Sequence, residues 1–201
     1  MLRTILVNKK LILASRSPRR QSLLRQIGLE FEVKESGVHE DGLDGSHPKE
    51  VVTLLSYRKA AAVASRDQQA TVIGADTIVV LDGSILNKPR DEEDAIDMLS
   101  RLSGRVHKVY TGFTLIDCPS LRSVSDVEVT DVTFRRLERE EIEAYVRSGS
   151  PMDKAGAYGI QDDYGAVFVE RIEGCFYNVV GFPLAKFFKT LRQFYHQTSS
   201  G

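Results

Sequence analysis

A short apolar run, Leu11-Ile12-Leu13-Ala14, stops abruptly at a polar stretch that contains Ser15, Ser17 and Pro18. A wholly apolar run of this length is typical of a buried strand. Ser17 has the side chain of a helix N-cap, and Pro18 suits the first helical position because its missing N–H is not needed there. The chain is therefore expected to pass from a buried strand, through one short loop, directly into a helix.

Two arginines, Arg19 and Arg20, fall in the first turn of this predicted helix. The aligned peptide dipoles already make that end positive, so further positive charge is unfavourable there unless an anion binds. Backbone N–H groups, a hydroxyl and two guanidinium groups together would form a phosphate-binding site. The alternative is an ordinary solvated helix start, and these residues alone leave both interpretations open.

Strands and helices alternate along the first half of the chain, and hairpin signals dominate the second half. This order favours an α/β fold with a mixed twisted sheet and flanking helices. Residues 1–201 are expected to form one domain, frayed at 198–201. The expected strands are 11–14, 31–33, 71–74, 77–81, 106–116, 124–134 and a hairpin of 165–172 with 175–180; the expected helices are 18–28, 48–66, 92–102, 138–147 and 183–194.

The charge balance excludes several classes of function. The 201 residues carry 27 basic and 28 acidic side chains, for a net charge of −1. That balance argues against a general nucleic-acid or membrane-surface protein, although a local anion site needs only a few cations. No apolar stretch approaches the ~20 residues that span a bilayer. Cys118 and Cys175 have no metal-type or redox-type spacing, and two thiols in a chain this long indicate a reducing compartment; the alternative is a disulfide between them. A cytoplasmic protein without nucleic-acid or membrane partners is therefore expected.

One acidic residue, Asp76, follows the small residues Gly74 and Ala75 at the end of an apolar run. Burying a carboxylate without a partner is costly, and a metal ion or a lysine would compensate its charge. Asp76 is therefore either a ligand of Mg²⁺ or Mn²⁺ that helps to activate water, or a structural cap or ion-pair partner.

Two lysines are candidates for phosphate binding. Lys88 follows the hairpin turn expected at Asp82-Gly83, and Lys59 lies in a predicted helix beside small alanines that would let it reach inward. A lysine is a compact positive charge that can neutralise a phosphate. The alternative for both is an ordinary solvated position, which is where most lysines lie.

Two loops could complete such a site. The first contains Glu35, Glu40 and Asp41, one of which could be a second metal ligand; acidic loops are otherwise simply solvated. The second runs from Lys154 to Gln161, and the Gln161 amide can read a base edge because it offers both a donor and an acceptor. Together with the arginines and lysines, these loops describe a polyphosphate–metal site of the kind that phosphoryl and nucleotidyl transfer require.

Many ordered motifs of the chain match one known family. The chain resembles the Maf proteins, which are nucleoside triphosphate pyrophosphatases, over nearly its whole length. The matching motifs are Leu13-Ala14-Ser15 with Ser17-Pro18-Arg19-Arg20, the stretch ending in Glu40, Lys59-Ala60, Ile73-Gly74-Ala75-Asp76-Thr77, Lys88-Pro89, Leu102-Ser103-Gly104, the run from Pro151 to Gln161, and Val180-Gly181-Phe182-Pro183-Leu184.

The resemblance implies a mixed α/β fold of the inosine triphosphate pyrophosphatase type, with two lobes around a central cleft. It implies hydrolysis of a nucleoside triphosphate to the monophosphate and pyrophosphate with Mg²⁺ or Mn²⁺, in a homodimer. Asp76 matches the proposed catalytic base, and Glu40 and Asp76 match the metal-linked acids. The positions that match phosphate contacts are Ser15, Arg19, Arg20, Lys59 and Lys88; those linked to base choice in the dTTP- and UTP-directed branch are Arg19, Thr77 and Gln161.

The chain departs from the family pattern after Gln161, where it reads Asp162-Asp163-Tyr164-Gly165 instead of a glycine and a shorter turn, and at His39, where relatives often carry an acid. The expected substrates are dTTP, UTP or modified pyrimidine nucleotides. Two other functions stay open at this point: a nucleotide-binding regulator of cell division that does not hydrolyse its ligand, and a pyrophosphatase for purine analogues such as ITP.

Overall fold

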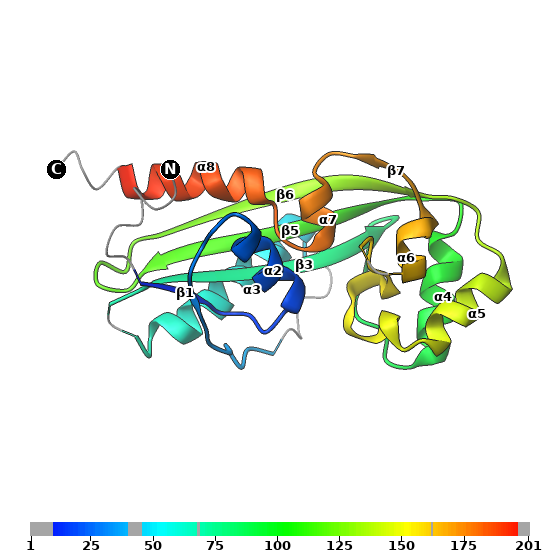
Figure 1. The fold of residues 1–201 in the computed structure, drawn as a ribbon, viewed down its shortest axis with the longest axis horizontal. Coiled ribbons are helices and arrows are strands. Elements are labelled where there is room, and N and C mark those ends of the chain that lie inside the picture. The colour runs from blue at the N-terminus through cyan, green and yellow to red at the C-terminus, as the bar shows by residue number, and fades with distance from the viewer. Residues whose placement is uncertain (1–9, 40–45, 68, 162, 197–201) are drawn as a thin grey trace. The chain divides into compact units, whose positions relative to one another are not determined.

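The computed structural model describes residues 10–39, 46–67, 69–161 and 163–196 (Figure 1). The chain divides into two compact units. The first unit holds the residues up to Asp76, Thr111–Glu128 and the residues from Gly181 onward. The second unit holds Thr77–Tyr110 and Val129–Val180.

The strands form a mixed sheet in the order β2-β1-β3-β5-β6-β7, with β4 paired to β3. β1 is parallel to both β2 and β3, whereas β3–β4 and β6–β7 are antiparallel. This arrangement confirms the predicted mixed α/β class. The strands are β1 (Leu11–Leu13), β2 (Glu32–Val33), β3 (Thr71–Leu81), β4 (Ser84–Leu86), β5 (Val106–Asp117), β6 (Ser123–Phe134) and β7 (Val169–Glu173).

The first unit contains the helices α2 (Pro18–Gln26), α3 (Pro48–Ala64) and α8 (Leu184–His196). Helix α8 is amphipathic, as its spacing predicts, and buries Phe187, Leu191 and Phe194. Helix α3 buries a complete face against the sheet, and Val52, Ala60 and Val63 on that face are almost fully buried. The predicted helices at 18–28, 48–66 and 183–194 are thereby confirmed, within two residues at each end.

Two strand glycines allow α3 to approach the sheet closely. A Cβ atom at Gly74 would lie 2.2 Å from the backbone oxygen of Ser56, and one at Gly112 would lie 2.5 Å from that of Val52. Any larger residue at either position would therefore push the helix away from the sheet. These contacts fix the distance between α3 and β3 near Asp76, which lies two residues beyond Gly74 on the same face of the strand.

The second unit contains α4 (Glu92–Leu102), α5 (Arg139–Arg147), the 3₁₀ turns η1 (Ser150–Asp153) and η2 (Ala155–Ala157), α6 (Asp163–Phe168) and α7 (Phe176–Val180). Asp91 caps α4, because its side chain accepts a hydrogen bond from the backbone N–H of Asp94 at 2.8 Å. Helix α5 begins with a capping box formed by Glu138 and Glu141. The predicted helices at 92–102 and 138–147 are thus confirmed.

The predicted hairpin of 165–172 with 175–180 is wrong. Gly165 to Phe168 belong to α6, and Phe176–Val180 is the short helix α7. Short apolar runs fit either a strand or a buried helix, and tertiary contacts decide between them. Here the contacts of the buried Asn178 favour the helix. Its side-chain amide donates to Val109 O and Thr130 Oγ1 at 3.0 and 2.9 Å.

The two strands predicted at 71–74 and 77–81 are one continuous strand, β3. The residues between them, Ala75 and Asp76, stay in extended conformation and are buried. The acid does not interrupt the strand because its charge is compensated by a lysine, as described below. The hairpin turn predicted at Asp82-Gly83 is confirmed by the β3–β4 pairing.

An aromatic cluster forms part of the core of the second unit. His107, which is 2% exposed, packs edge-on against Phe134 and Tyr158 with ring centroids 4.9 and 5.3 Å away. His107 Nε2 and the Tyr158 hydroxyl form a hydrogen bond of 2.8 Å. Burial lowers the pKa of His107 to about 4, so the ring is neutral at physiological pH.

Among the helices in the described part of the chain, none combines the length and the apolar character that a bilayer crossing requires.

We expect Gly74→Ala to destabilise the fold by about 3 kcal/mol, because the new Cβ atom collides with helix backbone rather than with a movable side chain. Chemical denaturation of the variant and the parent protein measures the difference. Ala62→Ser, a half-buried position on the same helix, is the control and should change the stability by less than about 0.5 kcal/mol. Equal stabilities of Gly74→Ala and the parent would contradict the close approach.

We expect the stability to fall as the pH drops from about 6.5 to about 4. In this range the unfolded chain protonates His107, with its ordinary pKa of 6.5, whereas the folded protein, with a pKa of about 4, does not. The loss attributable to His107 approaches about 1.4 kcal/mol per pH unit. Urea titrations at several pH values should show a steeper loss for the parent than for His107→Phe, and parallel curves would refute the assignment.

Candidate functional site

The loop between β1 and α2 has the conformation that its sequence predicts. Ser17 caps α2, because its hydroxyl accepts a hydrogen bond from the backbone N–H of Arg20 at 3.4 Å, and Pro18 begins the helix. Ser15 Oγ accepts two hydrogen bonds, from Ser17 N at 3.3 Å and from Arg20 Nη1 at 3.1 Å. The buried Ser15 hydroxyl therefore helps to fix the conformation of the loop.

Arg20 also fixes this loop to a distant part of the chain. Its Nε donates to the carbonyl oxygen of Gly181 at 3.1 Å. One guanidinium group thus joins the loop after β1 to the segment that leads into α8. The role of Arg20 is in part structural, which its position in the sequence does not reveal.

The start of α2 keeps the positive electrostatic character that an anion site needs. No acidic residue occupies its first turn, and Arg19 and Arg20 are half-buried there. Arg16 pairs with Glu35 at 2.7 Å, and both of these side chains are largely exposed. The helix N-terminus and the two arginines therefore form a region where an anion is stabilised.

Lys59 and Asp76 form a buried ion pair. Lys59 Nζ lies 2.6 Å from Asp76 Oδ1, and the side chains are 9% and 7% exposed. Lys59 comes from the buried face of α3 and Asp76 from β3. Because Ala60 packs against Gly74, the helix lies near enough for Lys59 to reach the strand. Of the two interpretations of Lys59, the structure confirms the inward one.

The register of the parallel strands places the loop after β1 beside the middle of β3, where Asp76 lies. Leu13 pairs with Ile73, and the backbone N–H of Ala14 donates to Ile73 O at 2.8 Å. Ser15 therefore leaves the sheet beside the Gly74–Asp76 stretch of β3. The first unit thus gathers five of the predicted site residues on neighbouring elements, namely Ser15, Arg19, Arg20, Lys59 and Asp76.

The remaining predicted residues lie elsewhere. Thr77 is half-buried and follows Asp76 directly on β3. Lys88 and Gln161 are exposed residues of the second unit, in the turn after β4 and after η2. Glu40 lies outside the described residues. The loops of Lys88 and Gln161 are connected, because Gly156 N donates to Asn87 O at 3.1 Å.

The residues are compatible with a divalent metal that binds together with phosphate. Within the described ranges, no group of three or more His, Cys, Asp or Glu residues could hold a metal ion by itself. Mg²⁺ typically uses one or two carboxylates together with phosphate oxygens of a substrate and water. Asp76, with one oxygen bonded to Lys59, fits such a site, and a second carboxylate would have to come from a residue such as Glu40.

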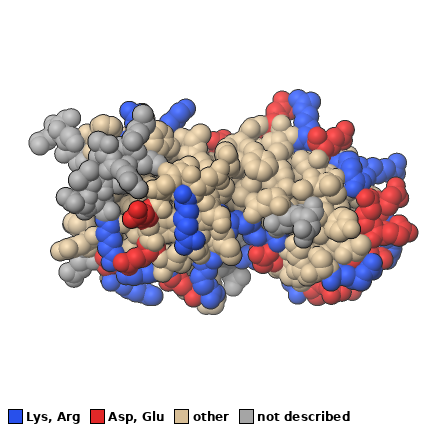
Figure 2. All heavy atoms as spheres, viewed as in Figure 1, with Lys and Arg blue, Asp and Glu red and all other residues tan. Residues whose placement is uncertain are grey.

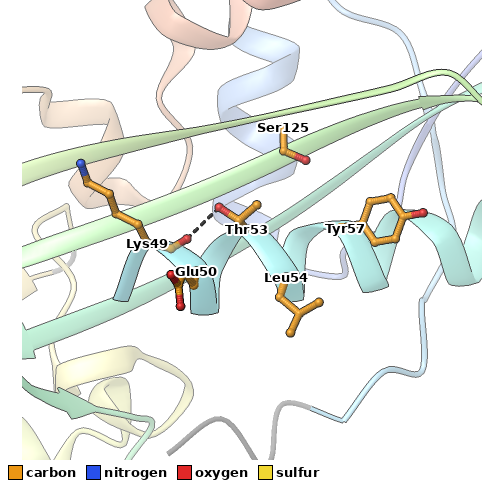
Figure 3. A pocket seen from close by; sticks show the side chains of 6 residues that line it. All are labelled: Lys49, Glu50, Thr53, Leu54, Tyr57 and Ser125. Atoms are coloured by element: carbon orange, nitrogen blue, oxygen red, sulfur yellow. Dashed lines mark hydrogen bonds between the residues drawn. The ribbon is translucent and has the colours of Figure 1, made fainter. Parts of the chain in front are cut away.

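A separate groove of about 400 Å³ lies along the outer side of α3 (Figure 3). It contains none of the predicted site residues. Thr53 Oγ1, on α3, donates to the carbonyl oxygen of Lys49. The residues that line it are Lys49, Glu50, Thr53, Leu54, Tyr57 and Ser125.

Two buried residues of the second unit were not identified from the sequence. The signal for His107 is the alternation around it, with Val106 and Lys108 exposed and Val109 buried, which marks it as inward-facing. Lys154 is also buried, and its Nζ contacts Ser150 O and Asp153 Oδ1. A lysine in a loop gives no signal of burial, so this contact could not be predicted.

Comparisons with known proteins identify the family. The family model for Maf, described as Maf-like protein, matches residues 10–194. A dTTP/UTP pyrophosphatase from Carboxydothermus hydrogenoformans is 50% identical over 184 residues, which cover 92% of this chain and 98% of that protein. A dTTP/UTP pyrophosphatase from Clostridium perfringens is 49% identical over 187 residues, which cover 92% of this chain and 97% of that protein.

Two solved structures are more distantly similar. A nucleoside-triphosphatase or dITP/XTP pyrophosphatase from Mycobacterium abscessus has a TM-score of 0.42 at 15% identity, covering 64% of this chain and 75% of that chain. The Ham1 protein of Staphylococcus aureus has a TM-score of 0.44 at 16% identity, covering 63% and 72%. The assignment to a family therefore depends on the sequence matches, which extend over nearly the whole length, and by these the chain belongs to the Maf family.

Proposed function

We propose that this protein hydrolyses dTTP and UTP to the nucleoside monophosphate and pyrophosphate. The observation that carries the proposal is the buried Lys59–Asp76 pair, located where β3 runs beside the arginine-bearing loop after β1. A carboxylate beside a phosphate-binding loop is the minimal arrangement for phosphoanhydride hydrolysis. The two relatives named dTTP/UTP pyrophosphatase, which are 50% and 49% identical to this chain, support the same activity.

The loop binds the triphosphate. The backbone N–H groups at the start of α2, the Ser15 hydroxyl and the guanidinium groups of Arg19 and Arg20 are all donors suited to phosphate oxygens. Because Arg20 already donates hydrogen bonds to Ser15 and to Gly181, little ordering is needed when the ligand binds. This prior order favours tight binding of the polyphosphate.

Asp76 acts as the general base. The Lys59 ammonium group compensates its negative charge inside the protein and so holds it as a carboxylate. Asp76, whose Oδ1 is bound to Lys59, takes the proton of the attacking water. Lys59, Arg19 and Arg20 offset the negative charge that develops on the phosphate oxygens.

The family resemblance also links residues of the second unit to the nucleotide. We assign Lys88 to the phosphates, and Thr77 and Gln161 to the base. Uracil and thymine present a carbonyl acceptor beside a ring N–H donor, and the Gln161 amide carries the complementary donor and acceptor. This complementarity is consistent with a preference for dTTP and UTP.

We further propose a requirement for Mg²⁺ or Mn²⁺, held by Asp76 and Glu40 together with substrate phosphates. When bound, the cation would neutralise phosphate oxygens and stabilise the charge on the leaving pyrophosphate. A homodimer and a cytoplasmic location remain predictions of the family resemblance. The free thiols of Cys118 and Cys175 are consistent with a reducing compartment.

We expect Asp76→Asn to lower kcat for UTP by about 10²- to 10⁴-fold, because the amide cannot accept a proton from water. Asp76→Glu is the sharper test, since it retains the charge opposite Lys59 but moves the carboxylate by one methylene. It should keep most of the stability and still lose most of the turnover. Thermal melts must accompany the kinetics, because Asp76→Asn leaves the Lys59 charge buried without its counter-charge. Parental rates in a folded Asp76→Asn protein would refute the role of base.

We expect pyrophosphate release from dTTP and UTP, and a slower reaction with CTP and ITP, in a panel of triphosphates assayed with Mg²⁺. In water labelled with ¹⁸O, attack at the α-phosphorus places the label in UMP, as we propose, whereas attack at the β-phosphorus places it in pyrophosphate. Mass spectrometry of both products distinguishes the two. Release from ITP alone would identify a purine-analogue enzyme, and binding without any release would identify a non-hydrolysing regulator.

A further inference from the structure

We propose that His107 is a positioning residue for base selection, which holds the Gln161-bearing loop in place through Tyr158. The inference depends on the proposed function, because it assigns Gln161 to the base. All the residues that carry the argument belong to the second unit.

The loop from Lys154 to Gln161 has little regular structure of its own. Its centre is the three-residue turn η2, where Gly156 and Ala157 adopt positive φ angles of 68° and 60°. No strand pairing is assigned to any part of this loop. A loop of this kind stays in one conformation only where specific contacts determine it.

A small number of contacts hold the loop. Gly156 N donates to Asn87 O at 3.1 Å, and a Cβ at Gly156 would lie 2.9 Å from the Val79 side chain on β3. Gly159 N donates to the Tyr145 hydroxyl at 3.3 Å. Tyr158 joins the loop to β5 through its 2.8 Å hydrogen bond with His107.

Burying the polar imidazole ring of His107 destabilises the fold unless a hydrogen bond compensates for the lost contact with water. The ring is 2% exposed and lies among the aromatic rings of Phe134 and Tyr158. Within the described chain, its Nδ1 is buried without a hydrogen-bond partner. Phenylalanine would fill the same space without that penalty. The polar contribution that only histidine makes is the hydrogen bond to Tyr158.

The loop transmits this restraint to its exposed end. Tyr158 is buried and extended, with φ −146° and ψ 158°, and Gly159 after it is buried too. Ile160 is buried as well, and Gln161 is the first exposed side chain beyond it. The amide that reads the base is thus three residues from the His107–Tyr158 hydrogen bond. The Gln161 amide distinguishes uracil from cytosine only when it is correctly oriented. The hydrogen bond between His107 and Tyr158 sets that orientation by holding the loop in one conformation.

The test compares His107→Phe and Tyr158→Phe, which remove the two partners of the same bond, with the double variant. We expect each single variant to reduce the UTP-over-CTP ratio of kcat/KM about three- to tenfold, with kcat for UTP changed less than about twofold. The double variant should lose no more than either single one, because the bond can be lost only once. His107→Gln, whose amide reaches toward Tyr158, should restore part of the ratio.

A matched control separates positioning from general destabilisation. Val80→Ala removes buried methyl groups from the face of β3 opposite to Val79. It should lower the melting temperature without changing the UTP-over-CTP ratio. The inference is overturned when His107→Phe behaves like this control, losing stability while the ratio stays at the parental value.

Hydrogen exchange supplies a readout that does not need catalysis. The amide of Gly159 should exchange at least about tenfold faster in His107→Phe and Tyr158→Phe than in the parent protein and in Val80→Ala. Unchanged exchange overturns the positioning role even in an active enzyme, and faster exchange with an unchanged ratio overturns the link to base selection. A parent protein that cleaves no triphosphate refutes the proposed function, and the exchange rates then still decide whether His107 holds the loop.

Discussion

The buried ion pair between Lys59 and Asp76 is the interaction on which the rest of the first unit depends. Two charges removed from water are tolerated only where their geometry is good, and a single partner left alone would be strongly destabilising. The pair can form because Gly74 lets α3 lie directly on the strand. The same close packing keeps β3 continuous through Asp76. One glycine therefore enables the helix packing, the unbroken strand and the placement of the acid.

The sequence was most informative where local physical chemistry decides the structure. The loop after β1 was predicted in detail, since Ser17 and Pro18 specify a helix start whatever surrounds them. The inward direction of Lys59 could only be offered as one of two possibilities, because it depends on how closely α3 approaches Gly74. That distance is a property of the packed sheet and is not encoded in the residues next to Lys59.

The incorrect and missed predictions also concern features that depend on contacts between distant parts of the chain. Residues 175–180 read as a strand, and they form a helix because Asn178 binds backbone and side-chain groups of β5 and β6. Position 107 gave only a weak signal, since its partner Tyr158 lies 51 residues away. Charged side chains of both signs are mixed on the surface, in keeping with the near-zero net charge (Figure 2). Their pattern gave no information about the contacts of Asn178 or about the contact between His107 and Tyr158. Long-range polar contacts of buried side chains were the part of the fold beyond prediction.

The hydrogen bond from Arg20 to Gly181 has a consequence for how the protein is made. It joins residues that are 161 positions apart, so the loop after β1 leaves the ribosome long before its carbonyl partner is synthesised. The first unit as a whole is assembled from three separate stretches of the chain, the last of which begins at Gly181. Domains fold as units during synthesis, and contacts between distant segments form late. The loop after β1 therefore acquires its hydrogen bond to Gly181 only after the segment that leads into α8 has been synthesised.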